Sequence, residues 1–387
     1  MRKGVASEAV YPWAHFYVEA AHVAKLARVL PGKGVLLLVG PRQSGKSTDS
    51  LALLRMLHKS GYQVVYVGLG ALVSSPHFDG DNIWSAVLDE LDVPVREGRS
   101  AFATLENPDE LPSLRAALVV VFDEVSSLLS RNGALREFLM HLRSLRHSLS
   151  LRHSSSMSNI RLGGVVLVGA PALQMDIMDA CADERWPSFV VAGVESSQLF
   201  SEAEIADLFQ QLVKERYHVP EESPQRWSRV IMSATEGVKG LSGAVLAEID
   251  GRWRLGEQFS LADLVIYLSG KCPGVLMQGM QKPCKSLLRA LSRTDEEMRC
   301  LLTDLFCTGR HLLEGRPPEA ALRLINDGVV HICTLKDNKH ALQISAPLLE
   351  QLLQSMAVEG MQPSVELHDP PMDLGHSMRW AGDWQPS

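Results

Sequence analysis

The feature that most constrains the fold of this chain is an apolar run that leads directly into a glycine-rich loop. Val35–Gly40 reads VLLLVG, and the next eight residues read PRQSGKST. Together they fit the pattern G-x-x-x-x-G-K-[ST], whose backbone amides wrap a phosphate where a helix begins. The residues that this pattern assigns to nucleotide binding are Gly40, Pro41, Arg42, Gln43, Ser44, Gly45, Lys46, Ser47 and Thr48.

Two side chains of this loop have specific expected functions. Lys46 would reach the β- and γ-phosphates of ATP, and the hydroxyl of Ser47 would hold Mg²⁺. The positive end of the following helix favours the same anion. The alternative is a turn that contains Gly-Lys-Ser by chance and binds nothing.

Five short runs rich in Val and Leu predict an α/β fold with a parallel sheet. None of them alternates with polar residues, which is typical of strands buried on both faces. Helical patterns separate the runs, as in a chain of strand–helix units. The runs are Val35–Gly40, Val64–Leu69, Leu118–Asp123, Val165–Ala170 and Phe189–Val194.

An acid pair ends the third run. Asp123 and Glu124 follow the apolar sequence LVVVF, so they should lie at the sheet edge where the loop at Lys46 also lies. Asp123 would then order the Mg²⁺ that Ser47 binds, and Glu124 would act as the base that activates water. The alternative is a strand that ends in two solvated carboxylates.

The predicted sheet domain spans 1–195, and the sequence after it predicts two further domains. A helical lid spans 196–258, where Ser201 and Glu204 have the spacing of a capping box. A winged-helix domain spans 259–356, because a helix ending at Asn326 precedes two strand-like runs that form a hairpin. The tail at 357–387 is rich in Pro and Gly, and we expect a disordered segment or a linker.

Composition excludes several functional classes. The net charge of −7 argues against a protein that coats nucleic acid. Six dispersed cysteines with no C-x-x-C pair argue against zinc and indicate reduced thiols. The sequence shows neither a signal peptide nor a membrane-spanning run, so we expect a cytoplasmic or nuclear protein.

These motifs, in this order, resemble those of the AAA+ and STAND-related P-loop ATPases, over roughly residues 10–350. The resemblance extends to Val165–Leu173, to Trp186–Phe209 and to the lid-like sequence Thr235–Gly243. It implies a five-stranded sheet in the order 5-1-4-3-2, with ATP and Mg²⁺ between the sheet and the lid. Within this class, the chain resembles the Crinkler-type and the archaeal-ATPase-like modules. In the Crinkler type a nuclease domain follows, for which the tail would be the linker.

Two positions depart from this family pattern. The fourth strand usually ends in a polar residue that senses the γ-phosphate, whereas here it ends in Ala170, which has no hydrogen-bonding side chain. The alanine favours slow ATP hydrolysis, or a protein that acts as a nucleotide-dependent switch and not as a motor. Arg185 is the best candidate for an arginine finger by its position, with an ordinary surface arginine as the alternative.

Three functions follow as hypotheses. The first is a Mg²⁺-dependent ATPase that uses Lys46 and Glu124 and couples hydrolysis to movement of the lid and winged helix. The second is an ATP-gated signalling or scaffold switch with little hydrolysis, acting on a protein partner or by self-association. The third is a nucleic-acid-associated helper ATPase. For this the basic segment Arg143–Ser156 is a candidate phosphate contact, with a solvated loop as its alternative. The helix Pro317–Asn326 favours packing or protein contact over base reading.

Overall fold

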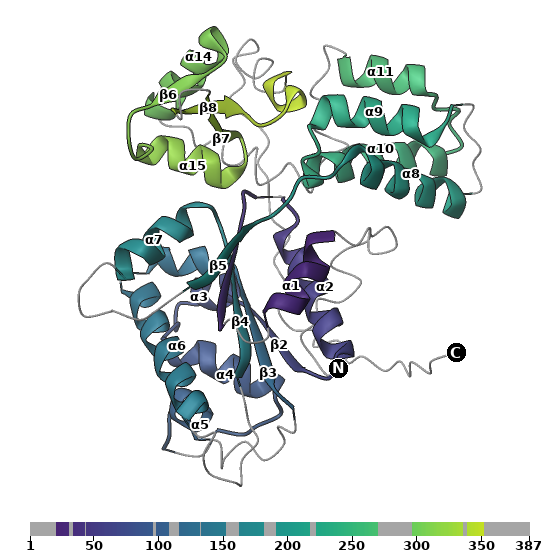
Figure 1. Cartoon of the computed structure of the whole chain (residues 1–387). Helices are drawn as coiled ribbons and strands as arrows, with labels where there is room; N and C mark the ends of the chain where they lie inside the picture. Colours follow the sequence, from purple (N-terminus) through teal and green to yellow (C-terminus); the bar gives the residue numbers. More distant parts are fainter. Residues whose placement is uncertain are drawn as a thin grey trace.

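A computed structural model gives the arrangement of the chain (Figure 1). The residues that it describes fall into a sheet unit, a helical unit (α8 to α11) and a C-terminal unit (α14 to β8). None of the helices within these described residues has the length and apolar character needed to cross a membrane. The described ranges are 21–30, 34–42, 44–95, 98–107, 116–131, 133–151, 162–181, 191–216, 222–269, 296–335 and 339–351.

The sheet unit contains five parallel strands in the order β2-β3-β4-β1-β5. This is the predicted order 5-1-4-3-2 counted from the opposite edge, so the predicted topology is confirmed. β4 lies between β3, which carries the acid pair, and β1, which leads into the P-loop. The strands are β1 (Val35–Val39), β2 (Gln63–Gly68), β3 (Leu118–Asp123), β4 (Leu162–Gly169) and β5 (Val191–Ser196).

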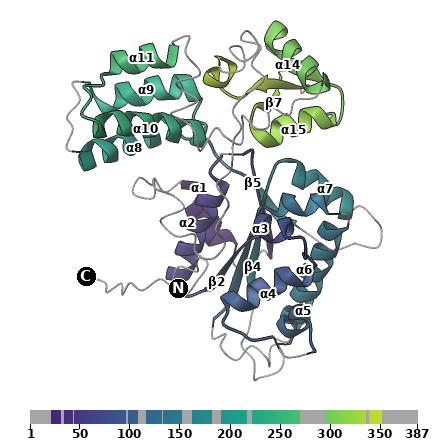
Figure 2. The same ribbon diagram turned by 180° about the vertical axis from the view of Figure 1, so that it is seen from behind.

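Helices cover both faces of this sheet (Figures 1 and 2). Leu36 and Leu38 of β1 pack on one face with α1 and α2, while Leu37 packs on the other face in the same cluster as Trp84 of α4. Since both faces are covered, the strands read as continuous apolar runs. The covering elements are α1 (Ala21–Val29), α2 (Lys46–Lys59), α3 (Leu69–Ser74), α4 (Asp81–Glu90), α5 (Ala101–Leu105), the 3₁₀ helix η2 (Val125–Ser130), α6 (Ala134–Leu151) and α7 (Ala172–Cys181).

The course of α6 corrects one expectation. The apolar pattern predicts a helix that ends at Leu145, with the basic segment Arg143–Ser156 in a loop. α6 instead continues to Leu151, so the first part of that segment is helical. The sequence between Leu145 and Leu151 contains neither Gly nor Pro to end the helix. Residues 152–160 lie outside the described ranges.

The helical unit is built around stacked aromatic rings. Phe209 and Trp227 stack at 4.8 Å between ring centroids, and Trp253 meets both. The predicted capping box is confirmed, because Glu204 Oε2 accepts the N–H of Ser201 at 2.8 Å while Ser201 Oγ accepts the N–H of Glu204 at 3.2 Å. The helices are α8 (Glu202–Arg216), α9 (Pro224–Thr235), α10 (Lys239–Arg254) and α11 (Leu261–Ser269).

The predicted boundary at 258/259 places α11 with the winged helix and stays a prediction. In Figure 1, α11 lies beside α9, and the two helices are in contact. α10 begins at Lys239, so Gly240 and Gly243 of the lid-like sequence lie within this helix.

The C-terminal unit contains the predicted hairpin and one strand that the sequence pattern missed. β7 (Val330–Thr334) and β8 (His340–Ile344) form the hairpin, and β6 (His311–Leu313) pairs with the other edge of β8. Among the described residues, this unit also contains α14 (Glu296–Thr308), α15 (Glu319–Asp327) and a helical segment at 347–351. The tail at 357–387 lies outside the described ranges.

Candidate functional site

The P-loop forms the turn between β1 and α2. Gly45 has φ +86° at the start of α2, a conformation that glycine adopts without strain. A Cβ atom at Gly40 would lie 2.6 Å from Ser44 Oγ, so a side chain at the first glycine of the motif would clash within the loop. Lys46, Ser47 and Thr48 form the first turn of α2, whose free N–H groups favour an anion. Gln43 lies outside the described residues.

Lys46 is held inside the loop. Its Nζ donates to the carbonyl oxygen of Pro41 at 2.6 Å and to Ser44 Oγ at 3.4 Å. Burial lowers the pKa of Lys46 to about 8, and Arg42 contributes in the same direction. Asp123 and Glu124 oppose this shift, because both carboxylates lie near the ammonium group. The loop and the acid pair therefore form one electrostatic site.

Asp123 is oriented by two hydrogen bonds at the end of β3. Its Oδ2 accepts the hydroxyl of Tyr66 at 2.5 Å, and its Oδ1 accepts the N–H of Glu124 at 2.7 Å. The side chain is 4% exposed, so the carboxylate is fixed at the sheet edge. Such a fixed, buried oxygen donor suits Mg²⁺, which prefers carboxylates and tolerates little distortion.

Glu124 turns away from the strand toward α3. Its backbone has φ 58°, an uncommon value for a residue with a side chain. Its carboxylate accepts the N–H of Gly70, and a Cβ atom at Gly70 would lie 1.8 Å from Oε2. Glu124 is exposed as a residue, but partial burial of its carboxylate raises its pKa, and the negative charge of Asp123 raises it further. A carboxylate with a raised pKa is a stronger base.

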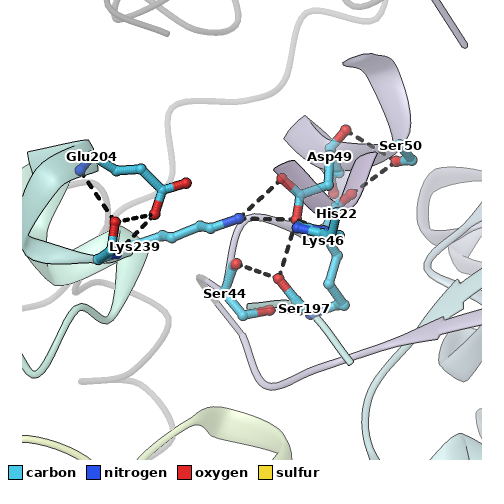
Figure 3. A network of polar contacts seen from close by, with 10 residues as sticks. His22, Ser44, Lys46, Asp49, Ser50, Ser197, Glu204 and Lys239 are labelled. Carbon is cyan, nitrogen blue, oxygen red and sulfur yellow. Dashed lines mark hydrogen bonds and ion pairs between the residues drawn. The ribbon is translucent and has the colours of Figure 1, made fainter. Parts of the chain in front are cut away.

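A buried ion pair joins the helical unit to the P-loop helix (Figure 3). Lys239 Nζ lies 2.9 Å from Asp49 Oδ2 and 3.0 Å from Oδ1. Asp49 also accepts the hydroxyl of Ser197 at 3.3 Å, and His22 Nε2 lies 3.2 Å from the same carboxylate without hydrogen-bond geometry. α1, α2, the end of β5 and α10 therefore meet at one carboxylate.

Neither Lys239 nor Asp49 stands out in the sequence as a site residue. The aliphatic part of Lys239 covers the P-loop, since a Cβ atom at Gly45 would lie 2.5 Å from its Cδ. One signal was available: a lysine is the first residue of α10, although the positive end of a helix disfavours a cation. A lysine in that position indicates a function other than helix stability.

The C-terminal unit also contacts the P-loop. The N–H of Arg42 donates to the carbonyl oxygen of Asn326 at 2.9 Å, and Arg42 Nε lies 3.2 Å from Asp327 Oδ1. Asn326 Oδ1 accepts the N–H of Ala172 at 3.2 Å, just beyond the end of β4. Burial raises the pKa of Asp327, and Arg42 acts against that shift. The C-terminal end of α15 thus bridges the P-loop and the β4 end.

Ala170 and Arg185 are the two positions singled out in the comparison with the family pattern. Ala170 follows β4 directly, at the sheet edge expected for the missing polar side chain. Arg185, the candidate arginine finger, lies outside the described residues, so its function stays a prediction.

Comparisons with known proteins bear on the fold. No protein-family model and no curated protein sequence matches the chain. Among solved structures, the ORC2 protein of Aeropyrum pernix in its ADPNP-ADP complexes is 13% identical, with a TM-score of 0.55 over 89% of this chain and 95% of that one. A Walker-type ATPase of Pyrococcus abyssi is 16% identical, with a TM-score of 0.54 over 87% of this chain and 96% of that one. The chain therefore has the fold of the AAA+ P-loop ATPases, as these two structures do.

Proposed function

We propose that this chain binds ATP with Mg²⁺ and hydrolyses its β–γ phosphoanhydride bond. The observation that carries the proposal is the proximity of Lys46 to the acid pair, which is close enough for Asp123 and Glu124 to act on the pKa of the lysine. A glycine-rich turn at a helix start, a partly buried lysine and two carboxylates at one sheet edge are the groups that phosphoryl transfer requires.

Each residue has a distinct function in this proposal. The amides from Ser44 to Ser47 and the ammonium of Lys46 bind the phosphates. Ser47 and Asp123 would hold Mg²⁺, which supplies positive charge to the developing transition state when it is bound. Glu124 accepts the proton of the attacking water, and its raised pKa suits that function. The hydrogen bond from the N–H of Gly70 holds the carboxylate of Glu124 toward α3 and away from β3.

Steady-state ATP hydrolysis by the full chain tests the proposal. We expect Glu124→Gln to bind ATP as tightly as the wild type but to turn over at least about 100-fold more slowly, which is the usual contribution of a general base. We expect Lys46→Ala to lose nucleotide binding. Glu297→Gln, on an exposed residue of α14, removes the same charge away from the site and should change neither property. Equal turnover by Glu124→Gln would remove the proposed base.

The contacts between units support a coupling of nucleotide binding to domain movement. Lys239 comes from the helical unit, and Asn326 and Asp327 come from the C-terminal unit, yet all three contact the P-loop or its helix. Groups that bind phosphate would change partners when ATP arrives, since Arg42 and Lys239 now pair with carboxylates. Both units would then shift with the nucleotide state.

A nucleotide-gated switch with little hydrolysis is the second candidate. The N–H of Arg42 in the P-loop already donates to the carbonyl oxygen of Asn326, so this amide is not free to bind a phosphate. Ala170 also lacks a polar side chain that could contact the γ-phosphate. Both observations favour the switch. A single-turnover assay with radiolabelled ATP separates the two. The switch predicts bound ATP that persists, whereas the enzyme predicts its conversion to ADP.

The partner acted upon stays a prediction. A protein partner or self-association is favoured over nucleic acid, because Arg323, the basic side chain of α15, pairs with Glu319 of the same helix. Filter binding to DNA at two salt concentrations would reveal a phosphate-contacting surface by its salt dependence.

A further inference from the structure

The end of β4 lies where a side chain could meet the terminal phosphate of bound ATP. β4 is the strand between β1 and β3, and the N–H of Gly40 donates to the carbonyl oxygen of Gly169 at 3.2 Å. The P-loop therefore lies on one side of the β4 end, and the acid pair lies on the other. The methyl group of Ala170 offers no hydrogen bond at this position.

A hydroxyl from another element bonds to the backbone of Ala170. Ser126 belongs to η2, which begins directly after Glu124, and its Oγ accepts the N–H of Ala170 at 2.7 Å. The left-handed backbone at Glu124 turns the chain so that η2 follows the acid pair without continuing the strand. Ser126 therefore reaches the end of β4 from η2, the segment that follows the neighbouring strand β3.

The space for this hydroxyl depends on a glycine. A Cβ atom at Gly169 would lie 2.8 Å from Ser126 Oγ and 2.3 Å from Leu173 Cδ2. Any larger residue at 169 would therefore displace the serine side chain. Gly169 and Ala170 together leave room at the β4 end for the hydroxyl of Ser126.

The hydrogen bond to Ala170 leaves the serine hydrogen available. A hydroxyl has one hydrogen to donate and two lone pairs that accept, and Ser126 uses a lone pair toward Ala170. Within the described residues this is the hydroxyl's one recorded hydrogen bond. A fixed oxygen with a free O–H is suited to contact a phosphate oxygen.

We propose that Ser126 donates a hydrogen bond to the γ-phosphate of ATP and so replaces the polar side chain that β4 lacks. The inference rests on the proposed function, because it names a further ligand of the same nucleotide. It also implies that Ala170 does not by itself prevent hydrolysis. The group recognised is a terminal phosphate, so ADP does not engage Ser126.

The neighbouring serine provides a matched control. Ser127 is also in η2, and its Oγ is buried without a hydrogen-bond partner among the described residues. Ser127→Ala removes the same atom from the same short helix but removes no hydrogen bond among the described residues. Ser126→Thr keeps the hydroxyl but adds a methyl group, so it tests whether a change in side-chain packing alone alters nucleotide binding.

Binding of ATPγS and of ADP, measured by calorimetry for the full chain, is the first readout. We expect Ser126→Ala to weaken ATPγS binding about 10-fold or more, the usual effect of losing a hydrogen bond to a charged group. ADP binding should stay unchanged, and Ser127→Ala and Ser126→Thr should resemble the wild type. Equal affinity of Ser126→Ala and wild type for ATPγS would overturn the inference, as would equal losses for ATPγS and ADP.

A rescue experiment provides the second readout. Ser126→Ala combined with Ala170→Asn restores a polar side chain at the end of β4, and we expect ATPγS affinity and turnover to recover relative to Ser126→Ala. A double variant that binds ATPγS no better than Ser126→Ala would contradict the shared function of the two positions. If wild type binds neither nucleotide, the proposed function fails; if it binds both and Ser126→Ala behaves like wild type, only this inference fails.

Discussion

The ammonium group of Lys239 lies 2.9 Å from the carboxylate of Asp49, although the two residues are 190 positions apart in the sequence. Both side chains are almost fully buried, with 8% and 3% exposure. Lys239 begins the helix of one unit, and Asp49 follows Lys46 by about one helical turn in another. This ion pair therefore ties the position of the helical unit to the helix that carries the P-loop.

We expect Lys239→Ala to destabilise the protein by about 3 kcal/mol, because it leaves the buried carboxylate of Asp49 without its cation. Urea unfolding monitored by circular dichroism measures this loss. Lys214→Ala, on an exposed residue of α8, removes the same charge and should cost less than about 0.5 kcal/mol. Similar losses for the two variants would show that the pair contributes little.

The lowered pKa of Lys46 predicts how nucleotide affinity depends on pH. Below the value of about 8, Lys46 is already protonated, so affinity for ATPγS should be nearly constant. Bound phosphates raise the pKa of the lysine, so binding above pH 8 requires proton uptake and affinity should fall by up to about tenfold per pH unit. Calorimetric titrations from about pH 7 to about pH 10 measure this trend.

Lys46→Arg is the control for that pH dependence, because an arginine stays protonated throughout this range. Its affinity for ATPγS, whatever its absolute value, should lack the decrease above pH 8. A decrease of the same size in Lys46→Arg would assign the effect to another group.

We expect Gly70→Ala to slow hydrolysis while ATP binding is retained. A Cβ atom at residue 70 would lie 1.8 Å from Glu124 Oε2, so the proposed base must move. A displacement of about 1 Å at a catalytic group can cost on the order of 100-fold in rate. Gly68→Ala is the matched control, since a Cβ atom there has no neighbour within 4 Å. Unchanged kcat in Gly70→Ala would argue against a catalytic position for Glu124.

Asp327→Asn should strengthen ATP binding. The carboxylate of Asp327 pairs with Arg42 of the P-loop and would repel a triphosphate there. Removing a partly exposed charge of this kind is worth roughly 1 kcal/mol, or about fivefold in affinity. Glu319→Gln, at the other end of α15, removes the same charge from an exposed position and should have no effect. Weaker ATP binding by Asp327→Asn would mean that the C-terminal unit supports the nucleotide site.

The parallel sheet was predictable because β1, β3 and β4 are buried on both faces, whereas its strand order came from the resemblance to AAA+ ATPases. β1 and β3 are apolar at every interior position, and each leads directly into a motif with its own sequence signature. Lys46, Asp123 and Glu124 follow from that local pattern, and their mutual proximity follows from the parallel strand order.

The contacts between units could not be predicted in the same way. Lys239 and Asn326 reach the P-loop only because tertiary packing brings distant segments together, and no local pattern specifies that packing. Ser126 is equally inconspicuous, since its position depends on the left-handed turn at Glu124. β6 was missed because it is three residues long and forms only by pairing with β8.

Calorimetric titration of the full chain with ATPγS in the presence of Mg²⁺, beside Lys46→Ala, tests the central claim most directly. We predict saturable binding at one site per chain for the wild type and no measurable binding for Lys46→Ala. A wild-type protein that takes up no nucleotide, or a Lys46→Ala variant that binds as tightly as the wild type, would contradict the claim that this loop is a nucleotide site.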